Sequence, residues 1–144
     1  MPDSKYGKYI INNPLSIAPD YIQTKDIKGV TFPNEIFMSS DLVKNAPVII
    51  DIGWCFTVPD PDPVEKIHSH PYDTILCLVG SDSQNSSNLG AVLEIKLGEE
   101  KHVLTQTCAI YIPKGLEHAL LIHKEVSRAY LKIEFALTGA NTTK

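Results

Sequence analysis

The stretch His68-Ser-His-Pro-Tyr-Asp-Thr-Ile-Leu-Cys-Leu-Val-Gly80 decides the fold of this chain of 144 residues. His68 and His70 are separated by one residue and are followed by a turn signal, Pro-Tyr-Asp. Because side chains on a strand alternate between its two faces, both imidazoles are predicted to point to the same side. The apolar run 74–79 that follows is typical of a strand covered on both faces. The stretch therefore predicts a strand preceded by two histidines that can bind one metal ion.

A second stretch, Pro113-Lys-Gly-Leu-Glu-His118, carries a third histidine on the way into another predicted strand. Gly115 is predicted to adopt a positive φ in the turn that presents His118, and Pro113 to stiffen that turn. Neutral imidazole is a common protein ligand for zinc, iron, copper and nickel. Three histidines with open positions are typical of a catalytic metal rather than a structural one.

The rest of the chain predicts an all-β domain with almost no helix. Apolar and polar residues alternate over several short segments, which are separated by turn residues at regular spacing. Such a pattern is typical of an antiparallel sandwich or barrel. The predicted strands are 48–58, 64–70, 74–79, 90–97, 102–105, 108–112, 118–123 and 129–137.

Composition narrows the function classes. The net charge is −4, from 13 basic and 17 acidic residues, and no basic cluster is present. We therefore expect neither nucleic acid nor a membrane surface as the main partner. No apolar stretch approaches the ~20 residues of a membrane span, and the first residues lack the apolar run of a signal peptide. Three widely spaced cysteines, Cys55, Cys77 and Cys108, indicate reduced core residues of a cytoplasmic protein.

Taken together, the two histidine stretches resemble the motifs of the cupin superfamily, a jelly-roll-type antiparallel β-barrel. The first cupin motif is a His-x-His pair, a carboxylate and then a glycine, which His68, His70 and Gly80 match. The second is Pro-x-Gly-x-x-His, which Pro113, Gly115 and His118 match without a gap. The resemblance covers roughly residues 48–137 and implies a single cupin barrel that holds a divalent metal ion.

The sequence departs from the cupin pattern at the carboxylate. In the family a glutamate usually follows the second histidine after three or four residues, where this chain has Thr74 and Ile75. Asp73 has the six-residue spacing to Gly80 that the glutamate shows, but lies one position early and is shorter. The expected ligand set is His68, His70, His118 and Asp73, with Thr74 or a water molecule as the other ways to complete it.

The resemblance implies three functions from different classes. The first is a metal-dependent enzyme that performs lyase, decarboxylase or isomerase chemistry on a small, anionic, oxygen-chelating substrate. The second is an Fe(II)-dependent dioxygenase, and the third is a binding module without catalysis. Asp51 and Tyr72 are the candidates for proton transfer, because the sequence shows no second acid–base pair that fixes the reaction. Tyr72, Trp54, Phe56 and Tyr111 are candidates for the wall of a substrate site or for plain core.

Two further histidines are expected on the surface: His123, five residues beyond His118 and so predicted on the opposite face, and His102 at a hairpin edge. The expected organisation is an irregular arm over 1–47, a barrel over 48–138 and a frayed tail over 139–144. The arm is predicted to hold short strands around 9–12 and 29–32 and one helical turn after Ser39 and Ser40. Small cupin-like barrels usually pair, which implies a homodimer that uses this arm.

Overall fold

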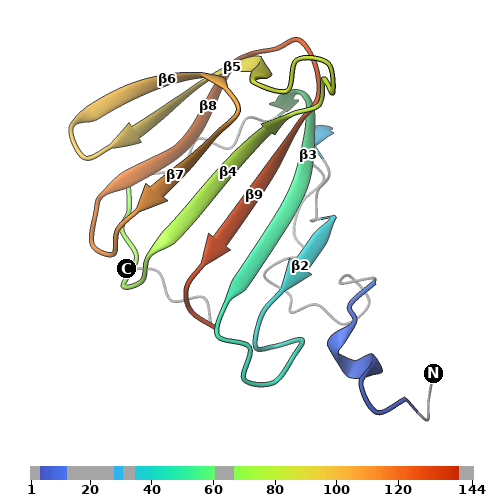
Figure 1. The fold of residues 1–144 in the computed structure, drawn as a ribbon. Helices are drawn as coiled ribbons and strands as arrows, with labels where there is room; N and C mark the ends of the chain where they lie inside the picture. Colours follow the sequence, from blue (N-terminus) through green and yellow to red (C-terminus); the bar gives the residue numbers. More distant parts are fainter. Residues whose placement is uncertain (1–3, 13–27, 31–34, 61–66, 140–144) are drawn as a thin grey trace.

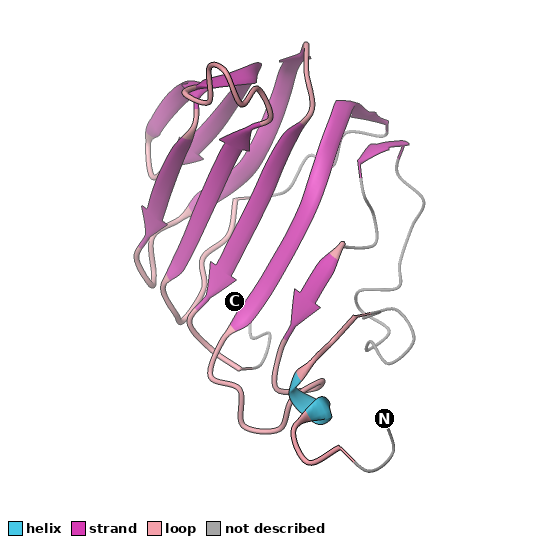
Figure 2. Cartoon of the chain, turned by 45° about the vertical axis from the view of Figure 1, so that its right-hand side comes forward, coloured by secondary structure: helices cyan, strands magenta, loops and turns pink. Residues whose placement is uncertain are grey.

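The computed structural model describes residues 4–12, 28–30, 35–60 and 67–139. Parts of the predicted strands at 29–32 and 64–70, and the tail beyond residue 139, lie outside these ranges. The described chain is built almost wholly of strands (Figure 2). They are β1 (Lys28–Val30), β2 (Ile36–Met38), β3 (Ile49–Asp60), β4 (Thr74–Gly80), β5 (Asn88–Leu97), β6 (Glu100–Gln106), β7 (Cys108–Ile112), β8 (His118–Val126) and β9 (Tyr130–Ala136).

The strands form two antiparallel sheets, as the alternating sequence pattern predicted. The larger sheet has the order β1-β3-β9-β4-β7, with β2 also paired to β3, and the smaller has the order β6-β5-β8. Figure 1 shows β3, β9 and β4 side by side, with β5, β6 and β8 gathered at one side of the molecule. β9, the last strand, lies between β3 and β4, so the centre of the larger sheet is formed by pairing between residues far apart in the sequence.

The main core lies between the two sheets. Alternate residues of β4 and β5 supply most of it, because their inward side chains are large and aliphatic. Cys55 on β3 and Tyr130 on β9 join this cluster. Its buried members are Cys55, Leu76, Leu78, Leu89, Ala91, Leu93, Ile95, Leu121 and Tyr130.

The apolar run of β4 is buried on one face only. Leu76 and Leu78 are buried, whereas Ile75, Cys77 and Val79 between them are partly exposed. The prediction that both faces of this strand are covered is therefore correct for the inner face, whereas the outer face is only partly covered. Among the described residues, the outward side chains of β4 lie next to apolar residues of β9 in the same sheet, such as Phe135 opposite Ile75. A continuous apolar run thus does not by itself report two covered faces.

The arm joins the barrel through β1 and β2. Both short strands pair with β3, and β2 places Phe37 opposite Asp51. Residues 7–9 form a short 3₁₀ helix instead of the strand expected at 9–12. The expected helical turn follows Ser39, whose carbonyl accepts hydrogen bonds from the N–H groups of Leu42 and Val43 at 3.1 and 3.0 Å. No helix in the described ranges is long and apolar enough to span a membrane.

Candidate metal centre

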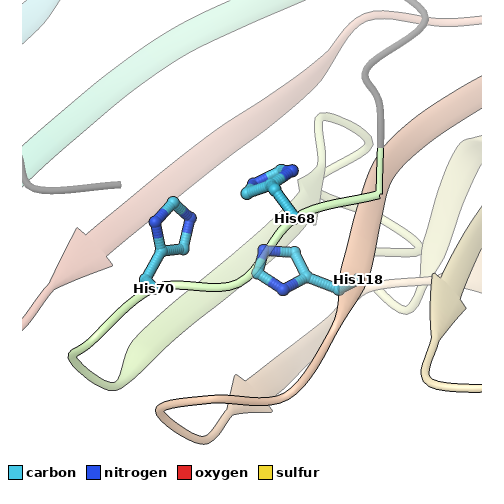
Figure 3. A group of neighbouring side chains, drawn as sticks. All are labelled: His68, His70 and His118. Carbon is cyan, nitrogen blue, oxygen red and sulfur yellow. The ribbon is translucent and has the colours of Figure 1, made fainter. Parts of the chain in front are cut away.

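The segment with the histidine pair is joined directly to the start of β8. The N–H of His68 donates to the carbonyl of His118 at 2.9 Å, and the N–H of His118 donates back to the carbonyl of His68 at 2.9 Å. This reciprocal pair is an isolated antiparallel bridge between residues 50 positions apart. Figure 3 shows the His68 and His70 side chains rising from this segment and His118 reaching toward them from β8. Backbone pairing between the two segments therefore brings the three imidazoles together.

The turn before β8 holds His118 in place. The N–H of Gly115 donates to the carbonyl of His70 at 2.9 Å, and the N–H of Leu116 donates to the carbonyl of Pro113 at 3.1 Å. Gly115 has φ +82°, as the sequence predicted, and an added Cβ there would meet no atom within 4 Å. Glycine is therefore favoured at this position by its backbone conformation and not by lack of space.

The three imidazoles form one compact group. One nitrogen of each ring lies within 4.8 Å of the others. The ring centroids of His68 and His118 are 4.4 Å apart, those of His68 and His70 4.8 Å, and those of His70 and His118 5.2 Å. Two nitrogens bound to one ion at ~2.1 Å each are at most ~4.2 Å apart, so small ring movements bring this set into contact with a metal.

The chemistry of the donor set fits a divalent metal ion. His118 Nδ1 lies 2.9 Å from the carbonyl of Leu116, and a donated hydrogen bond there leaves the Nε2 lone pair to bind a cation. His70 Nδ1 is buried and has no hydrogen-bond partner in the described structure. Burial lowers the pKa of both His70 and His118, and the neighbouring His68 lowers both further. Neutral rings are the form that binds a metal.

Asp73 does not lie with the histidines. Its Oδ1 accepts a hydrogen bond from the N–H of Lys114 at 2.8 Å. A hydrogen bond from the Tyr111 hydroxyl and that from Lys114 hold the pKa of the Asp73 carboxyl below its usual value. The reason is strand alternation: Thr74 faces the interior of the barrel, so the residue before it faces away. Asp73 thus caps the turn that carries His118. Among the described residues, the group within 4.8 Å holds only the three histidines.

Thr74 and Tyr72 occupy the inner side instead. The Thr74 hydroxyl is buried without a hydrogen-bond partner in the described structure. The Tyr72 ring stacks on His70, with centroids 4.9 Å apart and planes inclined by 17°. Tyr72 also packs against the second buried cluster, which contains Phe37, Ile49 and Ala136. Among the other aromatic residues considered for a substrate wall, Phe56 and Tyr111 are more than half exposed.

Asp51 is on the inner face of β3, because it is four residues before buried Cys55 and alternate strand residues share a face. Glu134 on β9 is directly opposite Asp51, and the sequence did not identify it as a candidate site residue. Burial raises the pKa of Asp51 to about 6, Lys132 opposes that rise and Glu134 adds to it. The sequence feature that could have indicated Glu134 is the alternation of β9, which places Tyr130, Lys132 and Glu134 on one face.

His123 is also on an inner face, against the prediction that it opposes His118. On β8, His118 is opposite Leu97 of β5, and His123 is opposite Leu93 of β5. The two histidines are five residues apart, whereas their partners on β5 are only four residues apart and share one face. The extra residue is a bulge, which reverses the alternation beyond it. His123 Nε2 then lies 2.6 Å from the hydroxyl of buried Tyr130. His102, by contrast, is exposed as predicted, with its Nε2 2.9 Å from Glu100.

Comparison with solved structures identifies this architecture as the cupin fold. An oxalate oxidase in complex with the substrate analogue glycolate is 14% identical with a TM-score of 0.55, and the alignment covers 100% of this chain and 66% of that one. A cupin-2 domain from Rhodospirillum rubrum is 8% identical with a TM-score of 0.52, over 84% of this chain and 70% of that one. No protein-family model and no curated protein sequence matches the chain. The chain has a cupin jelly-roll fold with a three-histidine group that fits a metal ion.

Proposed function

We propose that this protein is a metal-dependent cupin enzyme that acts on a small, anionic, oxygen-chelating molecule. The observation that carries the proposal is the group of three imidazoles, held by backbone pairing with one nitrogen of each within 4.8 Å of the others. Such a set leaves positions on the ion open for substrate, which is typical of catalytic rather than structural metals.

Electrostatics favour an anionic substrate. Three neutral imidazoles leave a divalent ion with its full positive charge, and the structure does not bring Asp73 into the group to lower it. A bound ion supplies Lewis-acid stabilisation of negative charge that develops on a substrate oxygen. Glycolate, the analogue bound by the structurally similar oxalate oxidase, is a small chelating anion of the class we expect here.

The reaction we favour is non-redox, of the lyase, decarboxylase or isomerase type. A set of inward-facing ionisable residues, Asp51, Lys132 and Glu134, supports proton-transfer chemistry inside the barrel. An Fe(II)-dependent dioxygenase is the second candidate, because three imidazoles also suit iron. Oxygen consumption with candidate substrates separates the two. A non-catalytic module would bind the metal and glycolate but turn over none of these substrates.

The deciding experiment measures metal content and uptake. We expect about one equivalent of Zn, Fe, Mn, Ni or Cu in the purified or reconstituted protein. His70→Ala should weaken Zn²⁺ affinity by more than the ~100-fold that loss of an outer-shell partner causes. His102→Ala is the matched control, because His102 is an exposed histidine that pairs only with Glu100 in the described structure. Less than a tenth of an equivalent, with no uptake on reconstitution, would remove the enzyme proposal.

A homodimer that uses the arm remains part of the proposal. The arm exposes apolar side chains: Tyr6, Tyr9 and Ile10 are 62%, 55% and 63% exposed. Burying such residues against a second copy would remove that apolar surface from water. Light scattering distinguishes the states, and a mass near the 15.9 kDa of one chain would contradict the dimer.

A further inference from the structure

The outer face of the larger sheet is apolar from β2 to β7. Leu76 and Leu78 of β4 point into the core, so the residues that alternate with them point to the other side, away from the smaller sheet. Strand pairing extends that side across the strands that Figure 1 shows next to one another. The outer face consists of two cross-strand rows and their extension along β3: Ile36, Ile52, Ile133, Cys77 and Ala109 in one row, Met38, Ile50, Phe135, Ile75 and Tyr111 in the other, and Phe56 and Val58.

The alternation on β3 and β9 is the reverse of that in a sheet with one face in water. Such a sheet turns its apolar residues inward and its polar residues outward. Here Ile133 and Phe135 point outward, whereas Glu134 between them points inward, as does Asp51 on β3. No member of the two rows is charged. The outer face therefore has the composition of a surface that another molecule covers.

The area that the outer face exposes matches a protein interface. Phe56 and Tyr111 are 51% and 54% exposed, so each leaves about 100 Å² in contact with water, out of the ~150–250 Å² of an aromatic side chain. Ile36 and Val58 are 47% and 41% exposed, and the side chains in the centre of the rows are partly exposed. The whole face then presents roughly 700 Å², close to the ~800 Å² that each partner buries in a standard specific interface.

A second copy of this chain is the partner that fits the outer face. Two uncharged faces meet without repulsion, although each chain has a net charge of −4. A charged partner surface would lose hydration there without gaining an opposite charge, and the sequence has no basic cluster for an anionic lipid surface. A twofold contact uses the same patch on both subunits, and apolar sheet faces stack about 10 Å apart in β-sandwiches.

We propose that two copies of this chain form a symmetric dimer in which the outer faces of their larger sheets stack on each other. The inference rests on the homodimer of the proposed function and deepens it, because it assigns the main contact to the barrel. Ile36 and Met38 connect the two, since β2 belongs to the arm and is also part of the outer face. The contact lies on the side of the larger sheet away from β8 and His118, so each barrel keeps its own metal centre.

The first test measures the dimer dissociation constant by sedimentation equilibrium. Wild type should have a mass about twice the 15.9 kDa of one chain. Ile133→Glu, in the middle of its row on β9, should raise the dissociation constant at least ~100-fold, because twofold symmetry buries the new charge twice. Val103→Glu is the matched control, since Val103 is 65% exposed on β6 of the smaller sheet. It should change the dissociation constant by no more than about twofold.

The second test uses Cys77 as a chemical probe of the same contact. Cys77 belongs to the outer face, whereas Cys108 is opposite Leu78 and packs against the main core. Ile36→Glu provides the monomer, because Ile36 is half exposed and lies two strands away from β4. Alkylation of Cys77 by N-ethylmaleimide should be about tenfold slower in the wild-type dimer than in Ile36→Glu, with Cys108 as the internal reference.

The outcomes separate the outer face from the homodimer. Equal Cys77 rates, or an Ile133→Glu dimer as tight as that of wild type, would overturn the assignment of the face alone. Far-UV circular dichroism checks that each variant folds, and Ile36→Glu replaces Ile133→Glu in the sedimentation comparison if that variant does not. A wild-type mass of one chain would overturn the homodimer and the inference together, while the metal-dependent function would stand.

Discussion

β4 and β9 are neighbours in the same sheet, yet they line the interior with opposite chemistry. Their register is continuous from Thr74 opposite Ala136 to Gly80 opposite Tyr130. At the two central inward positions β4 places Leu76 and Leu78, whereas β9 places Glu134 and Lys132. At these positions β4 therefore contributes to the core, whereas β9 contributes Glu134 and Lys132 to a charged wall that also includes Asp51 on β3.

The difference follows from the neighbours of each strand. β4 lies over β5, whose inward residues Leu89, Leu93 and Ile95 are nearly fully buried, so aliphatic side chains interlock there. β9 lies between β4 and β3 in the sheet, and its Glu134 is directly opposite Asp51 on β3. The interior thus has a side that supplies stability and a side that supplies chemistry, and mutations on the two sides should behave differently.

The largest effect on folding is expected from Leu78→Ala on β4. Leu78 is 0% exposed, so the substitution removes buried methyl groups and leaves a void. We expect a loss of about 3 kcal/mol in the free energy of unfolding, measured by chemical denaturation. Lys132→Met is the matched change, because Lys132 is directly opposite Leu78 on β9 and is partly exposed. It should change stability by less than about 1 kcal/mol, and equal losses in the two variants would contradict the division of the interior.

A smaller, pH-dependent effect is expected from Asp51→Asn. The pKa of Asp51 rises from 3.8 to about 6 on folding, so the folded protein keeps a proton that the unfolded chain releases. The free energy of unfolding of wild type should therefore fall as pH rises from about 4 to 6, by at most ~3 kcal/mol from this group. Asparagine cannot titrate, so the variant should lack this fall and exceed wild type in stability at pH 7.

The measurement compares unfolding free energies of wild type and Asp51→Asn between pH 4 and pH 7 in the presence of a chelator. Contributions of other titrating groups cancel in the difference between the two proteins. The gain at pH 7 is reduced by whatever attraction Lys132 supplies to the Asp51 carboxylate. Two parallel stability curves would mean that Asp51 is not held protonated in the interior.

Much of this molecule could be predicted from its sequence. The residues 108–112 form β7 as expected, and the three histidines from two distant motifs come together. These predictions succeeded because alternation and turn residues are local signals, and the two histidine stretches match cupin motifs. His123 was misplaced because the bulge in β8 depends on pairing with β5, which no local pattern reports.

The charged wall could not be predicted for a related reason. On β3 the apolar set Ile50, Ile52 and Trp54 has the more core-like appearance, but it faces outward. Alternation tells which residues share a face and not which face is inside, and partner strands decide that. Glu134 acquires its significance only because β9 inserts between β3 and β4, next to Asp51.

The smallest effect is expected from Asp73→Asn. This variant tests whether strand alternation, which turns Thr74 inward and Asp73 away from the histidines, keeps Asp73 out of the metal site. Asp73 faces away from Thr74 and accepts the Lys114 N–H, a bond that the Oδ1 of asparagine can keep. We therefore expect Zn²⁺ affinity by calorimetry to change by no more than about twofold, whereas even an outer-shell partner of a metal ligand typically contributes 10- to 100-fold. A larger loss would mean that Asp73 turns inward when the ion binds and supplies the fourth ligand.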